Sequence, residues 1–106
     1  MTVATELDYR SSDLNDNSVF IGNKPFMNYV MGVIMQFTTK NAEDVIIKAR
    51  GKFISRAVDV AEVASKRFMD NSIAVTNIRI DSEGFRNSEG RDVRVSLIEI
   101  TLSRNS

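Results

Sequence analysis

DVIIKARGKFI, residues 44–54, decides the fold, because within this stretch a strand pattern gives way to a helix pattern. The β-branched run Val45-Ile46-Ile47 is typical of a strand covered on both faces, so we expect a strand over residues 44–49. Beyond Gly51, apolar residues recur at steps of three and four, which predicts an amphipathic helix over residues 52–69.

VFIGNKPFMNYV, residues 19–30, repeats the same change from strand to helix further upstream. A short strand over residues 19–21 ends at Gly22, and Pro25 suits the first position of a helix, where its missing N–H is not needed. Apolar spacing predicts that this helix covers residues 25–38. Three methionines, at positions 27, 31 and 35, share one face of it, and we interpret them as flexible core-filling side chains.

Two further strands, over residues 73–81 and 92–102, are predicted to form a long hairpin. In both, the alternation of apolar and polar residues changes phase, which indicates either paired bulges or a sheet covered on one face near its base and on the other further out. We favour the second interpretation. A second covered face needs a partner, and another copy of the chain is the natural one, so we expect a homodimer.

The element order β-α-β-α-β-β predicts an α+β fold, a two-layer sandwich of one mixed sheet and two helices. Helical crossovers within one sheet normally keep strands parallel, so the first three strands should run in the same direction. Their carboxyl ends then lie at one edge of the sheet, where ligands of open α/β sheets characteristically bind. The two strand-to-helix turns, residues 21–25 and 48–52, and the hairpin all leave that edge.

Composition removes several classes of function. Cysteine and histidine are both absent from the 106 residues, which excludes thiol nucleophiles, imidazole bases and a zinc site, and no cofactor or other metal is implied. No apolar run approaches the ~20 residues of a membrane span, and the N-terminus has no signal-peptide pattern. We therefore expect a soluble, cytoplasmic protein with no membrane partner.

Charge is divided unevenly along the chain, although the 14 cations and 14 acids balance overall. Residues 1–17 hold four acids and one arginine and are predicted to form a mobile acidic tail. Residues 18–106, the predicted folded domain, keep 13 cations (14 minus 1) and 10 acids (14 minus 4), a balance of plus three. This excess is small, so the positions of the cations must decide their role.

Cations gather in the two turns and along the hairpin. A helix start offers unpaired N–H groups and the positive end of the helix dipole, so a neighbouring lysine or arginine completes an anion site. The predicted set is Lys24 in the first turn, Lys48, Arg50, Lys52 and Arg56 at the second, and Arg79, Arg86, Arg91 and Arg94 on the hairpin. Such cations neutralise phosphates without reading bases, and the chain shows neither a recognition helix nor an aromatic RNA-binding motif. The sequence predicts a sequence-tolerant nucleic-acid binder.

Two other functions stay open at this point. Asp81, Glu83, Glu89 and Asp92 gather near the hairpin tip and would suit a magnesium-dependent nuclease, although a projecting arm is a poor place for a rigid metal site. RNA or a ribonucleoprotein is a further possible partner, because the same edge would accept an A-form backbone.

Three segments, residues 19–30, 46–59 and 93–100, together resemble the Alba family of small archaeal chromatin proteins. The resemblance covers about residues 18–103. It implies a fold similar to the C-terminal domain of translation initiation factor three, a homodimer, association with the chromosome, and binding of double-stranded DNA and RNA by dimers that associate side by side. We expect no enzymatic activity.

The same resemblance assigns roles to individual positions. It implies nucleic-acid contacts at Lys24, Arg50 and Lys52, with Asn28 and Tyr29 beside the first turn, and a contact between dimers at Phe68. Many members carry two lysines in the first turn, and the first is acetylated. Here Asn23 replaces that lysine, so Asn23 keeps only a hydrogen-bonding role and Lys24 is the one candidate for acetylation.

Overall fold

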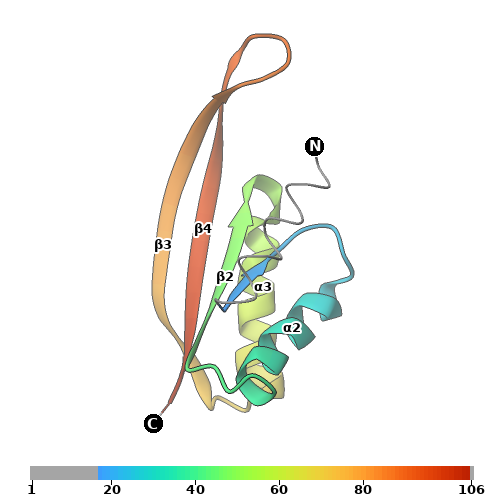
Figure 1. Cartoon of the computed structure of the whole chain (residues 1–106), viewed down its shortest axis with the longest axis vertical. Coiled ribbons are helices and arrows are strands. Elements are labelled where there is room, and N and C mark those ends of the chain that lie inside the picture. Colours follow the sequence, from blue (N-terminus) through green and yellow to red (C-terminus); the bar gives the residue numbers. More distant parts are fainter. Residues whose placement is uncertain (1–16, 106) are drawn as a thin grey trace.

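The structure, a computed structural model, describes residues 17–105, which form a four-stranded sheet with two helices against one of its faces (Figure 1). Strand, helix, strand, helix, strand, strand is the order observed, and the α+β two-layer fold is confirmed. Apart from Asn17, the predicted acidic tail lies outside the described residues. Among the described residues, no helix has the length and apolar character needed to cross a membrane.

The sheet topology points the carboxyl ends of three strands toward one edge, as predicted. The strands are β1 (Ser18–Phe20), β2 (Asp44–Arg50), β3 (Ile73–Arg86) and β4 (Asp92–Arg104), in the spatial order β1-β2-β4-β3. β1 runs parallel to β2, and β4 runs antiparallel to both β2 and β3. β1, β2 and β3 therefore point the same way, toward the edge from which the hairpin projects, and β3 continues beyond the end of β2 to the hairpin tip (Figure 1).

Only one face of the sheet is covered by α2 (Phe26–Thr38) and α3 (Ile54–Val63). Val45, Ile47 and Ala49 of β2 are buried under the helices, together with Ile100 and Leu102 of β4. The other face is called here the open face. Residues of β2 at even positions lie on it, and one of them, Ile46, is only half-buried. The prediction that this strand is covered on both faces is therefore wrong, because both helices pack on the same side.

The three methionines of α2 do not fill the core, which corrects the prediction made for them. Met27, Met31 and Met35 are each between 42% and 51% exposed, whereas Val30, Val33 and Phe37 are fully buried. Both sets recur at helical spacing, so the periodicity alone did not show which one faces the sheet. α2 thus presents a methionine stripe on its outer surface.

The second helix is composite, and it replaces the single helix predicted for residues 52–69. A 3-10 turn η1 (Gly51–Phe53) precedes α3, and a π-helical segment η2 (Ala64–Phe68) follows it. In this segment Met69 N–H donates to Ala64 O at 3.0 Å, and the buried Ser65 hydroxyl donates to Ala61 O at 2.7 Å. Asp70 and Asn71 then take positive φ and end the helix where expected.

The hairpin is longer than predicted, and it makes the molecule 49 Å long but only about 23 Å wide. Its phase changes have two different causes. In β3, Val75 pairs with Leu102 and Asn77 with Thr101, so Thr76 is an extra, bulged residue. In β4 the pairing is continuous, so Ile98 and Ile100 face the helices while Val95 and Leu97 lie on the open face. In β4 the apolar side chains change face, as predicted, whereas in β3 a bulge accounts for the change of phase.

Candidate nucleic-acid interface

The first basic turn, residues 21–25, is held in shape by its backbone. Ile21 N–H donates to Lys48 O of β2 at 2.9 Å, and Lys24 N–H donates to the Tyr29 hydroxyl at 2.9 Å. Pro25 is the N-cap of α2, one residue before the helix begins. Asn23 and Lys24 are exposed, so the side chains face solvent while the backbone is fixed.

Tyr29 and Arg56 hold this turn through contacts with its backbone. Tyr29 is only 8% exposed, and the Arg56 guanidinium lies 5.6 Å from the centre of its ring. Arg56 also donates from Nη1 to Gly22 O at 2.6 Å. Both residues were predicted to contact nucleic acid, and the structure places them against the first turn. Because Arg56 belongs to α3, this hydrogen bond connects the helix after the second turn to the loop of the first.

The second basic turn, residues 48–52, depends on Gly51. Its φ is +54°, a conformation that residues with a Cβ rarely adopt. A Cβ at this position would also lie 3.2 Å from a methyl carbon of Val95 on β4. Arg50 and Lys52 are exposed on either side of the glycine, and Lys52 Nζ lies 5.3 Å from the centre of the Phe53 ring.

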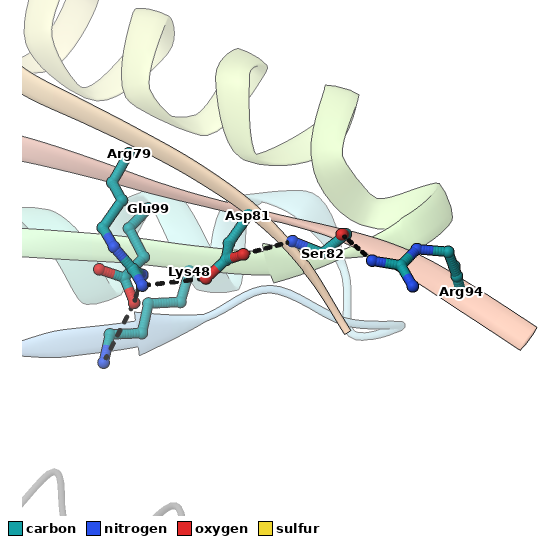
Figure 2. Close-up of polar contacts among 6 residues, drawn as sticks. All are labelled: Lys48, Arg79, Asp81, Ser82, Arg94 and Glu99. Carbon is teal, nitrogen blue, oxygen red and sulfur yellow. Dashed lines mark hydrogen bonds and ion pairs between the residues drawn. The ribbon is translucent and has the colours of Figure 1, made fainter. Parts of the chain in front are cut away.

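Acidic side chains of the open face pair with several predicted contact residues. Lys48 Nζ lies 3.9 Å from Glu99 Oε2, and Arg79 approaches the same oxygen at 3.4 Å (Figure 2). Arg79 also pairs with Asp81 at 3.1 Å, and hydrogen bonds continue through Ser82 to Arg94. These side chains are about one-third to one-half exposed, so each pair stabilises the fold by only ~0–1 kcal/mol. The pairs position the cations and remain exchangeable.

Arg50, the most exposed cation at the end of β2, has a partner on the hairpin. Its Nη2 lies 3.2 Å from Glu83 Oε1 on β3, so the ion pair crosses over β4. Glu83 and Glu99 were not predicted as partners of these cations. Alternation in β3 places Arg79, Asp81 and Glu83 on one face, but the cross-strand register that pairs Glu83 with Arg50 is visible only in the folded sheet.

The hairpin carries its cations on both faces. Arg79 lies on the open face, and cross-strand pairing puts Arg86 and Arg94 on the opposite one. Arg86 pairs with Asp92 at 3.5 Å, and Arg91 is exposed at the tip, where its N–H donates to the Asn87 side-chain oxygen at 3.0 Å. Asn28 is exposed on the first turn of α2. The structure therefore brings Lys48, Arg50 and Arg79 to one face but divides the hairpin arginines.

The acids near the tip do not assemble as the nuclease hypothesis requires. Asp81, Glu83 and Asp92 each pair with a different arginine. Within residues 17–105, no group of three or more carboxylates comes close enough together to hold a metal ion.

Comparison with known proteins agrees with this architecture. The family model described as Alba matches residues 17–82. The chain is 49% identical to DNA/RNA-binding protein Alba from Methanococcus maripaludis, over 82% of this chain and 97% of that protein. It is 54% identical to DNA/RNA-binding protein Alba from Nanoarchaeum equitans, over 79% of this chain and 93% of that protein.

Solved structures show the same arrangement. Alba from Thermoplasma volcanium superimposes with a TM-score of 0.75 at 50% identity, covering 83% of this chain and all of that chain. ALBA1 from Trypanosoma brucei has a TM-score of 0.63 at 23% identity, with 85% and 70% coverage, which supports the fold alone. The fold and the cations at the edge where β1 and β2 end, called the cationic edge, define a small α+β protein with a projecting hairpin. The chain belongs to the Alba family.

Proposed function

We propose that this chain binds double-stranded DNA and RNA with little dependence on sequence, and so organises the chromosome in the cytoplasm. One observation carries the proposal: the carboxyl ends of three strands bring both basic turns and the hairpin to one edge of the sheet. Cations gathered at one edge can contact neighbouring phosphates of one nucleic acid. The names of the relatives, DNA/RNA-binding protein Alba, support the same partners.

The contact set of the proposal is Asn23, Lys24, Asn28, Lys48, Arg50, Lys52, Arg79, Arg86 and Arg91. Tyr29 and Arg56 act in it as positioning residues, because one is buried and the other donates to the backbone of the first turn. Lys24 is exposed, so it is also the proposed site of acetylation. Acetylation would remove the one full charge of the first turn.

Binding is proposed without catalysis. This is supported by the separate arginine partners of Asp81, Glu83 and Asp92, which leave these carboxylates dispersed along the hairpin. Incubation of the protein with labelled duplex DNA or RNA and magnesium should return intact strands. Cleavage that co-purifies with the protein would contradict this part of the proposal.

A homodimer is part of the same proposal, and β3 offers its surface. Among the described residues β3 is an edge strand, and Val75, Ile78 and Ile80 on its helix-facing side are 43% to 76% exposed. An exposed apolar edge strand is a liability unless another chain covers it. Sedimentation equilibrium should give a dimer for the wild type and a monomer for Ile80→Lys. A wild-type monomer would contradict the proposal.

Side-by-side association of dimers is proposed at Phe68, which is 50% exposed in the π-helical segment η2. Such segments frequently occur at functional sites. Phe68→Ala should keep the dimer and its affinity for short duplexes but lower cooperativity on long DNA. Unchanged cooperativity in a gel-shift series of increasing DNA length would remove Phe68 from this role.

Salt dependence tests the central proposal. The affinity for duplex DNA should fall with salt at a log–log slope of about −0.9 per phosphate neutralised, equally for unrelated sequences. Arg50→Ala with Lys52→Ala should make this slope shallower by about 1.8. The matched control is Lys40→Ala with Lys66→Ala, which removes the same charge from exposed positions outside the proposed edge. An equal change in both variants would show that only net charge matters and would contradict the proposed surface.

A further inference from the structure

A cavity of about 450 Å³ opens where β1 and β2 end, beside both basic turns. Its apolar lining includes Phe20 of β1, Phe53 of η1 and Leu97 and Ile98 of β4. The volume falls within the range of roughly 300–1,000 Å³ that is usual for small-molecule sites. The site lies on the edge proposed to hold phosphates, yet phosphate binding alone has no use for an apolar cavity.

Cross-strand register explains how the cavity is built. On the open face, Phe20 pairs with Lys48, and Lys48 pairs with Glu99, so the three form one row across the sheet. Toward the tip, the next row places Leu97 beside Arg50. Leu97 therefore lies between two ion pairs, Lys48–Glu99 at 3.9 Å and Arg50–Glu83 at 3.2 Å. All four charged residues line the cavity.

This combination of groups matches the chemistry of one nucleotide. An apolar lining with aromatic rings accepts the flat face of a base, since stacking on aromatic side chains tolerates every base. The carboxylates of Glu83 and Glu99 can accept hydrogen bonds from base N–H groups. Lys48 and Arg50 can hold the attached phosphate, and because their ion pairs are partly exposed, they exchange readily.

We propose that the cavity binds an unpaired nucleotide, with its base against Leu97 and the Phe53 ring and its phosphate on Lys48 and Arg50. The inference rests on the proposed function, because the strand must first reach the cationic edge. Bases of an intact duplex are stacked and paired and cannot enter, so the occupant comes from a loop or a single strand. The protein then binds phosphates of any nucleic acid and distinguishes paired from unpaired segments at this one site.

Affinity for matched probes tests the proposal. The probes are a stem-loop RNA, a stem-loop DNA and fully paired duplexes of the same length. Stacking of one base is worth between about fivefold and a hundredfold in affinity, so the stem-loops should bind wild-type protein at least about fivefold more tightly than the duplexes. Preference for both stem-loops identifies the base and phosphate as the ligand, and preference for the RNA alone adds the ribose hydroxyl.

Leu97→Trp fills the cavity and should reduce stem-loop affinity to the duplex value while leaving duplex affinity within about twofold. Thr101→Trp is the matched control, because it introduces the same side chain on the same strand and open face outside the cavity. It should keep the preference for the stem-loop. Loss of preference in both variants, or in neither, would contradict the assignment to this cavity.

A measurement on the wild-type protein avoids any dependence on how the variants fold. A 2-aminopurine placed in the loop should become protected from acrylamide quenching when the protein binds, and one placed in the stem should not. Equal stem-loop and duplex affinity, or an unprotected loop base, would overturn the cavity proposal while leaving phosphate binding intact. Failure to bind any of the probes would overturn both proposals.

Discussion

The two basic turns occupy equivalent places in the chain, each between a strand and a helix, but they are completed in different ways. In the first turn the Lys24 N–H and Gly22 O are already bound by Tyr29 and Arg56, and one cation remains exposed. In the second turn a glycine with positive φ separates two exposed cations. The first turn is fixed by hydrogen bonds and the second by backbone conformation. Because the second turn carries two exposed cations and the first only one, the second should contribute more to binding.

The largest expected effect is the loss of duplex affinity when the cations of each turn are removed. Arg50→Ala with Lys52→Ala should weaken duplex binding at low salt about a hundredfold, taking roughly 1.5 kcal/mol for each lost charged contact. Lys24→Ala should weaken it about tenfold. Fluorescence anisotropy on a single duplex measures both values. If Lys24→Ala costs as much as the double substitution, the ranking of the turns is wrong.

The next largest effect is expected on stability, from the backbone conformation of Gly51. Gly51→Ala should lower the free energy of unfolding by about 2 kcal/mol, since a left-handed residue with a Cβ costs ~1–2 kcal/mol and the Cβ meets Val95 at 3.2 Å. Gly90→Ala is the control, because its φ is +80° with no atom within 4 Å of the added Cβ. It should cost only about 1 kcal/mol. Urea unfolding measures the difference in stability between the two variants. Equal losses of unfolding free energy would show that the Val95 side chain moves to make room for the added methyl group.

Removal of the Tyr29 hydroxyl tests how the first turn is held. Tyr29→Phe leaves Lys24 N–H without its acceptor and should cost about 1 kcal/mol of stability, with faster hydrogen exchange at that amide. Thr38→Val removes another hydroxyl from the same helix, where it donates to Ile34 O at 2.9 Å, and should leave exchange at Lys24 unchanged. Unchanged exchange in Tyr29→Phe would mean that the hydrogen bond does not fix the turn.

The smallest effect concerns the acid beside the second turn. Glu83→Gln frees Arg50 from its ion pair and should raise duplex affinity a few-fold at low salt, because exposed pairs are worth ~0–1 kcal/mol. Glu89→Gln removes the same charge from an exposed position near the hairpin tip. A smaller gain in duplex affinity for this control than for Glu83→Gln would show that the ion pair with Arg50 matters. An equal gain would show that only the change in net charge matters.

Most of the fold was predictable because local signals agreed with it. Gly22 with Pro25, and Gly51 after a β-branched run, marked two strand-to-helix turns, and element order then fixed the strand directions. The methionine stripe of α2 was misplaced because two apolar sets share the helix, and only packing shows which one faces the sheet. The bulge at Thr76 was mistaken for a change of face, because one extra residue shifts the alternation of apolar and polar residues in the same way.

The cations of the candidate site were predictable from the sequence, but the contacts that position them were not. Residue type and turn position indicated Lys24, Arg50 and Lys52, and all three are exposed. Sequence gave no sign that Tyr29 is buried beneath the turn or that Glu83 reaches Arg50 across a strand. Both facts depend on contacts between residues distant in the chain, which spacing along the sequence does not record.

The bulge at Thr76 also determines where the arm can change length over evolutionary time. Val75 and Asn77 already oppose consecutive residues of β4, so a deletion of the Thr76 codon would leave Arg79 and Glu83 on the open face. A codon lost between positions 78 and 86 would move every later side chain of β3 to the other face. Among descendants of this gene, we therefore expect single-residue length variation in β3 to accumulate at the bulge, with the rest of the strand constant in length.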